Sequence, residues 1–78
     1  MWNHRIIRHI EHRTHMDDSI YYAIHEVYYD EDGRVNGWSV EPIRIMEESL
    51  EDLKVTLQRL VESFDNPVLD AETKEAIL

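Results

Sequence analysis

The chain of 78 residues has no cysteine, only two glycines and two prolines, and no long hydrophobic run. Without cysteine there are no disulfides, and this usage favours a reducing compartment. Two glycines, Gly33 and Gly37, are too few for a loop that cradles phosphate. No segment reaches the ~20 apolar residues of a membrane span, and residues 1–15 lack the apolar core of a signal peptide. The sequence therefore predicts a cytoplasmic protein that uses no membrane and no nucleotide cofactor.

Charge of positive sign is also scarce, since 17 acidic residues face 8 lysines and arginines for a net charge of −9. Residues 1–15 hold three arginines against Glu11, a balance of +2, which leaves −11 for residues 16–78. Such a surface repels nucleic-acid phosphates, so no nucleic-acid partner is expected. The acidic groups either attract a basic protein or keep a small domain soluble.

The longest β-type run extends from Ile20 to Tyr29, breaks at residues 30–33, and resumes toward Trp38 and Val40. Tyr, Ile and Val suit a pleated, half-buried surface, and the Asp32-Gly33 pair supplies the positive φ of a tight turn. These residues predict a β-hairpin. Its second strand spans about residues 35–43, with Pro42 at its end or at a sheet edge.

The segment Asn3 to Arg13 fits two structures, because its isoleucines match both a helical stripe and alternate strand positions. A strand is the better interpretation. Its apolar residues are β-branched, no N-cap opens the segment, and the next run is itself a strand that needs a partner. Residues 14–19 would form the connecting loop.

Ser49 begins the clearest helical pattern, because a capping serine is followed by Glu51 and Asp52 in the first turn. Apolar residues then recur at spacings of three and four through Phe64. The chain Asn66-Pro67 ends the helix. A tail follows, in which Val68 and Leu69 are able to fold back on the sheet.

Together these elements predict one α+β domain over residues 1–78: a three-stranded antiparallel meander at about 3–43, a helix at about 50–65 packed on one sheet face, and a tail at 66–78. One helix covers one face only, and a chain of this size gains little stability from its own core. We therefore expect a protein partner, most simply a second copy in a homodimer. The candidate interaction surface consists of Tyr21, His25, Tyr29 and Trp38, of which the aromatic residues suit interfaces.

Five histidines invite a metal site, above all His9, His12 and His15. On a strand, however, His9 and His12 project to opposite faces, so no metal site and no cofactor are predicted. His25 and Glu26 form the best polar pair, but as sequential strand residues they also face opposite sides and make no acid-base couple. An ion pair of Glu26 with an arginine of the first strand is the simpler expectation. The chain is therefore predicted not to be an enzyme.

The ordered motifs from Tyr22-Ala23-Ile24-His25-Glu26 onward through Trp38, Glu41-Pro42 and the segment 65–70 resemble a group of small uncharacterised bacterial proteins. That resemblance implies a bacterial origin and the α+β fold, and it assigns no activity. The Ser49-Leu50-Glu51-Asp52 helix start after a hairpin and a proline is also similar to HicB-type antitoxin domains. The chain lacks the glycine-cysteine pair that such domains carry after the proline. The likeness implies an alternative function, an acidic antitoxin-like or phage-type inhibitor of a basic protein.

Overall fold

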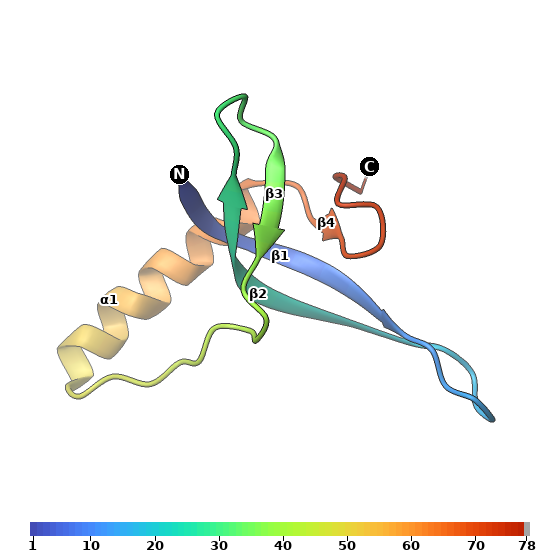
Figure 1. Ribbon diagram of the computed structural model, residues 1–78. Coiled ribbons are helices and arrows are strands. Elements are labelled where there is room, and N and C mark those ends of the chain that lie inside the picture. The colour runs from blue at the N-terminus through green and yellow to red at the C-terminus, as the bar shows by residue number, and fades with distance from the viewer. Residues whose placement is uncertain (78) are drawn as a thin grey trace.

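The computed structural model describes residues 1–77 and shows an α+β fold (Figure 1). Its strands are β1 (Trp2–Glu11), β2 (Ser19–Tyr29), β3 (Val35–Trp38) and β4 (Leu69–Asp70). The helix α1 (Leu50–Val61) continues into a 3-10 turn, η1 (Glu62–Asp65). The predicted α+β class is confirmed, whereas the arrangement of its sheet and helix differs from the prediction.

The first two strands form a long antiparallel pair in which Ile6 lies opposite Ile24 and Ile10 opposite Ile20. The strand interpretation of the N-terminal segment is therefore correct. Alternation divides the side chains between two faces. Ile7, His9, Tyr21 and His25 belong to one face, called here the core face. Ile6, Ile10 and their partners on β2, Ile24 and Ile20, belong to the opposite face, called here the helix-side face.

The predicted hairpin between β2 and β3 is present, and Asp30 organises its turn. The Asp30 carboxylate accepts hydrogen bonds from the backbone N–H of Asp32 at 2.9 Å and of Arg34 at 3.0 Å, while Gly33 takes a φ of 78°. β3 ends at Trp38 rather than near residue 43. Two further bonds, Ser39 N–H to the Glu26 carbonyl and Ile43 N–H to the Ile24 carbonyl, hold the following segment along β2.

A fourth strand corrects the predicted three-stranded meander. The sheet order is β3-β2-β1-β4, and β4 pairs parallel to β1, with Leu69 beside Ile7. The Arg8 guanidinium donates to the Asp70 carboxylate at 2.7 Å and fixes this edge. Two residues are too few to show a strand pattern, so only the expected return of Val68 and Leu69 to the sheet was predictable.

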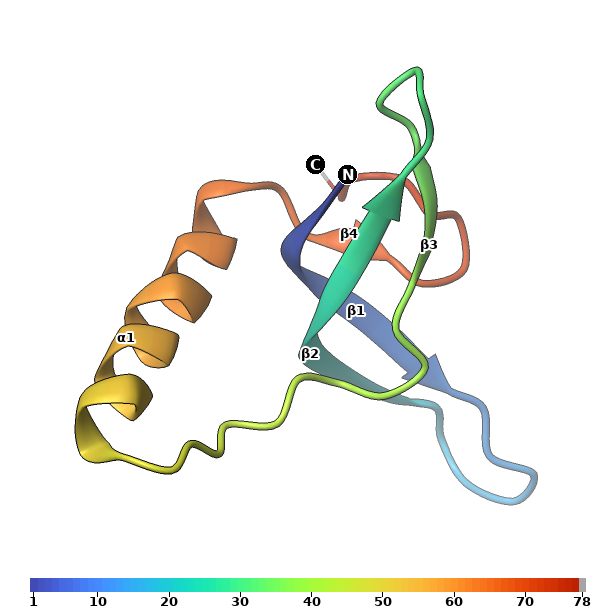
Figure 2. The same ribbon diagram turned by 60° about the vertical axis from the view of Figure 1, so that its left-hand side comes forward.

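The predicted helix cap is confirmed, because the Ser49 hydroxyl accepts a hydrogen bond from the backbone N–H of Asp52 at 3.1 Å. The helix was predicted to pack on one sheet face, and it does so only toward its C-terminal end. η1 contacts β1, whereas α1 begins far from the sheet and approaches it only toward its C-terminal end (Figure 2). Leu60 and Ser63 are buried there.

The core lies on the core face, away from α1. Ile7, Val27 and Leu69 form its buried centre. Around this centre pack four half-buried residues, Tyr29, Val35, Trp38 and Ala71. This cluster is thus completed by β3 and β4, while Leu60 of α1 and Ile6 are buried outside it.

Candidate functional site

Two histidines from adjacent strands meet on the core face. His25 is only 2 % exposed, and its Nε2 lies 2.9 Å from Nε2 of His9. Its Nδ1 lies 2.9 Å from the Ser39 carbonyl oxygen. A carbonyl only accepts, so His25 Nδ1 carries the proton and its Nε2 accepts a hydrogen bond from His9 Nε2–H. In this arrangement His9 is the donor and His25 the acceptor of the hydrogen bond between the two rings.

The surroundings of His9 favour its neutral form. Its ring stacks on Tyr21, with centroids 4.8 Å apart and planes 15° from parallel. Burial, followed by the influence of His25, holds the pKa of His9 below its usual value of 6.5. Protonation of His9 is therefore disfavoured in the folded state.

The histidine pair has no activated nucleophile. The Ser39 hydroxyl lies 3.2 Å from His25 Nδ1, but it donates its own proton to the Glu41 carbonyl at 2.8 Å. A protonated Nδ1 cannot act as a base toward that hydroxyl. The pair therefore stabilises the contact between β1, β2 and the segment after β3, and its geometry is not that of a catalytic dyad.

His12 lies at the end of the β1–β2 hairpin and holds that end against the C-terminal segment. Its Nδ1 lies 3.2 Å from the Asp18 carboxylate and its Nε2 lies 2.9 Å from the Glu72 carboxylate. The hydrogen bond that His12 donates to the Glu72 carboxylate, followed by the negative charge of Asp18, raises the pKa of His12 above 6.5. Residues 1–77 contain no group of three or more histidine, aspartate or glutamate side chains that could hold a metal ion.

The four residues predicted as an interaction surface all lie on the core face or beside it, and they differ in accessibility. Tyr21 is 47 % exposed, whereas His25 is buried. Trp38 and Tyr29 pack against the core, and the Tyr29 hydroxyl donates to the Asn3 side-chain oxygen at 2.7 Å. The part of this set that a partner can reach is mainly Tyr21.

The predicted ion pair of Glu26 is wrong. Glu26 accepts a hydrogen bond from the Tyr28 hydroxyl at 3.0 Å. The neighbouring arginines are directed elsewhere, because Arg5 donates to the Pro67 carbonyl and Arg8 pairs with Asp70. As predicted, Glu26 and His25 lie on opposite faces of the sheet, since successive residues of a strand alternate.

Sequence reasoning missed an accessible apolar surface that has two walls. The helix wall is the outward stripe of α1 and η1, and the sheet wall is the part of β2 on the helix-side face. Phe64 joins them, because it lines an apolar depression of about 380 Å³ together with Tyr22 and Ile24. We call the combination the apolar corner. Its helix wall consists of Leu50, Leu53, Leu57, Val61 and Phe64, and its sheet wall of Ile20, Tyr22 and Ile24.

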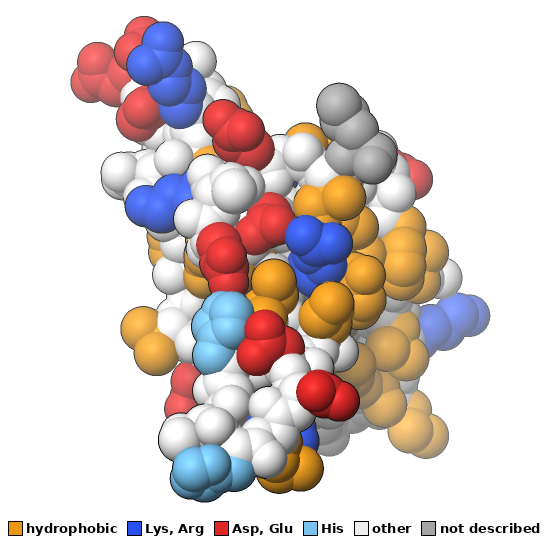
Figure 3. Space-filling view, turned by 90° about the vertical axis from the view of Figure 1, so that its right-hand side faces the viewer, with side chains coloured by type: hydrophobic (Ala, Val, Ile, Leu, Met, Phe, Trp, Pro, Cys, Tyr) orange, Lys and Arg blue, Asp and Glu red, His pale blue; other side chains and the backbone are white. Residues whose placement is uncertain are grey.

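The apolar corner is open to solvent. Leu50 is 86 % exposed, Phe64 71 % and Tyr22 62 %. The amphipathic spacing of the helix signalled an apolar stripe, but the sequence carried no sign that the stripe would be left uncovered. A view of the side opposite α1 also shows hydrophobic side chains gathered along one edge, and acidic side chains scattered among basic, histidine and uncharged ones over the rest (Figure 3).

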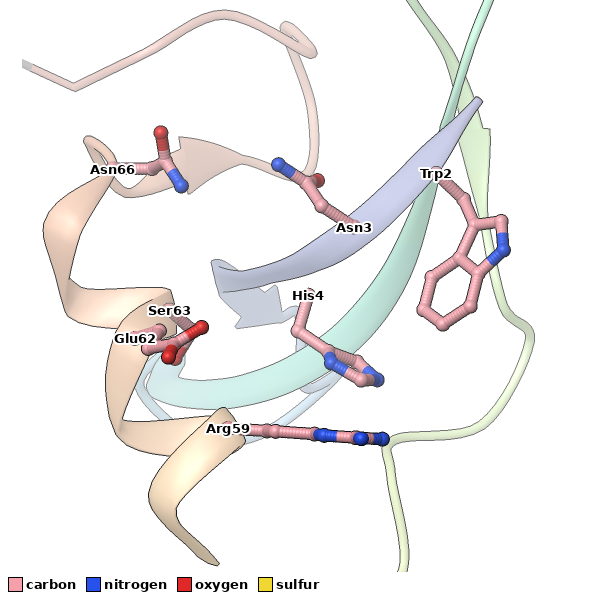
Figure 4. A pocket seen from close by; sticks show the side chains of 7 residues that line it. All are labelled: Trp2, Asn3, His4, Arg59, Glu62, Ser63 and Asn66. Atoms are coloured by element: carbon pink, nitrogen blue, oxygen red, sulfur yellow. The ribbon is translucent and has the colours of Figure 1, made fainter. Parts of the chain in front are cut away.

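A polar pocket of about 370 Å³ separates the first residues of β1 from the end of α1 (Figure 4). Arg59 extends from α1 toward His4, and Glu62 and Ser63 lie on the same side as Arg59. The Ser63 hydroxyl already donates to the Leu60 carbonyl at 2.6 Å, and Glu62 supplies a charge opposite to that of Arg59. With one positive and one negative side chain, this lining favours neither an anion nor a cation. The pocket is a gap in the packing between the end of α1 and the start of β1.

Comparison of the chain with protein-family models, with curated proteins and with solved structures finds no match. Among residues 1–77, no helix has the length and apolar character needed to cross a membrane.

Proposed function

We propose that this chain is a non-enzymatic, cytoplasmic protein-interaction module that acts as a homodimer. One observation carries the proposal: a single copy exposes too much surface for its mass. Its accessible area is 6337 Å² at 9.4 kDa. A compact monomer of that mass exposes roughly 5,000 Å², so the excess is about 1,300 Å². A stable protein interface covers about 800 Å² on each partner.

The shape of the chain supports the same proposal. The Cα radius of gyration is 14.2 Å, whereas a compact domain of this length has about 11.5 Å. The helix that stands off the sheet and the protruding β1–β2 and β2–β3 hairpins all extend the chain (Figures 1 and 2). Its outward stripe is apolar, and exposed apolar surface of this extent is typical of an interaction site.

The experiment is the mass in solution, by light scattering coupled to size exclusion, at low and high salt and at pH 5.5 and 8. We expect about twice 9.4 kDa, with little dependence on salt because the apolar corner is uncharged. Leu57→Glu, which places a charge in the helix wall, should give a monomer.

Val55→Glu is the matched control, because Val55 lies on the same helix outside the helix wall and is as exposed as Leu57, at 41 % against 43 %. This variant should remain a dimer. A monomeric wild-type protein at high concentration would contradict the homodimer.

A second candidate function is the inhibition of a basic protein by an acidic, antitoxin-like surface. The observation that favours it is the net charge of −9, with acidic side chains on the β2–β3 turn, on α1 and on the C-terminal segment. The likeness of the helix start to HicB-type antitoxin domains points in the same direction. Its test is the salt dependence of binding to a basic protein captured from the source cell, since affinity that is indifferent to ionic strength would exclude this function.

A further inference from the structure

The two walls of the apolar corner adjoin each other at Phe64, so one apolar partner can cover both. The helix wall extends away from the sheet, and the sheet wall meets it near Phe64. A rod about 10 Å across contacts both walls at once, and an α-helix has that diameter.

The chain itself supplies such a helix. The N-terminal half of α1, with Leu50 and Leu53, has no sheet beside it, while its C-terminal end adjoins the sheet wall. Each copy therefore has an open corner at one end of α1 and an uncovered helix half at the other. In two copies related by a two-fold axis, the uncovered helix half of each copy covers the open corner of the other, as in an isologous interface.

We infer that two copies pair through their apolar corners, with the α1 helices antiparallel and the N-terminal half of each helix lying in the corner of the other copy. The two-fold axis passes near Leu57, the middle of the stripe. Leu50 of one copy then lies beside Phe64 and Tyr22 of the other. This inference rests on the proposed function and specifies its partner and its geometry.

Surface charge permits this pairing. Glu51, Asp52 and Glu62 lie outside the helix wall, and Lys54 borders it. The acidic turn at residues 30–33 belongs to the far end of the β2–β3 hairpin. At physiological salt, repulsion between two acidic copies falls off over about 8 Å, whereas burial of the apolar corner is unaffected by screening.

Introduced cysteines test this geometry cleanly, because the natural chain has none. In an antiparallel pair, Leu50→Cys of one copy meets Phe64→Cys of the other. Within one copy these positions are roughly 20 Å apart along the helix, too far for a disulfide. We expect an equimolar mixture of the two single variants, mildly oxidised, to form a disulfide-linked heterodimer, and Leu57→Cys alone to form a linked homodimer.

The controls are Leu50→Cys alone and Val55→Cys alone, which should stay largely unlinked. A mass of one copy for the wild-type chain would overturn the proposed homodimer itself. A dimeric mass in which Leu50→Cys links to itself, or in which the mixture links no better than Val55→Cys, would overturn the antiparallel pairing and leave the homodimer standing. Because Leu50 and Phe64 are largely exposed in one copy, their substitution does not endanger the fold of the chain.

Discussion

The part-buried contact between His9 and His25 makes the stability of the fold depend on pH. His9→Ala leaves Nε2 of His25 buried without a donor, which we expect to lower the free energy of unfolding by about 1–3 kcal/mol at pH 8. The folded state lowers the pKa of His9, so below pH 6.5 the unfolded chain binds more protons at this residue than the folded chain does. The contribution of His9 is therefore complete above pH 6.5 and declines as the pH falls below it.

Urea unfolding of wild type and His9→Ala at pH 8 and pH 5.5 measures this dependence. The difference between the two proteins should be smaller at pH 5.5, and a difference that stays constant or grows would contradict the neutral pair. The comparison must be made within each pH, because His12 acts in the opposite direction: its raised pKa gives stability below pH 6.5 that is lost as the pH rises through its folded value.

The histidine contact also shows where residue-scale prediction from sequence ends. Alternation alone separated His25 from Glu26 correctly, because a period of two needs no partner. The meeting of His9 with His25 depends on the register between β1 and β2, which the loop at residues 12–18 fixes in the folded chain. No pattern within either strand specifies that register. The sequence therefore led us to consider His9, His12 and His15 as metal ligands and did not predict the contact of His9 with His25.

At the scale of elements, the β2–β3 turn offers a sharp test of backbone geometry. Gly33 has a φ of 78°, where a side chain is strained, although a Cβ there would meet no atom within 4 Å. We expect Gly33→Ala to lower the free energy of unfolding by about 1–2 kcal/mol through backbone strain alone. Gly37→Ala is the control, since Gly37 has equal free space and no positive φ. That variant should be neutral or stabilising by up to about 1 kcal/mol in thermal unfolding. Equal losses in both variants would contradict the assignment of the effect to φ.

The elements that the sequence predicted well are those with strong local signals. The long β-branched strands, the Asp-Gly turn and the Ser49 cap each depend on a few neighbouring residues, and all are present. β4 could not be predicted because its stability comes from Leu69 burial and the Arg8 to Asp70 ion pair, both made with residues distant in sequence. The placement of α1 escaped prediction for the same reason, since an apolar stripe does not specify which surface covers it.

A single copy of the chain leaves apolar surface uncovered. The cluster on its core face is packed by β3 and β4, whereas its apolar corner is exposed to solvent. Folding and association should then be linked, since a dimer that forms only from folded chains stabilises them by mass action. We expect the midpoint of thermal unfolding to rise when the protein concentration is increased a hundredfold.

Thermal unfolding followed by circular dichroism checks this expectation, in cells whose path lengths are shortened in proportion to the increase in protein concentration. Val55→Glu should keep the dependence on concentration, and Leu57→Glu should lose it, because only the second variant charges the helix wall. A midpoint that is independent of concentration in the wild-type chain would mean that the single copy is stable with α1 uncovered. The excess surface would then have to be explained by a different protein that covers the apolar corner.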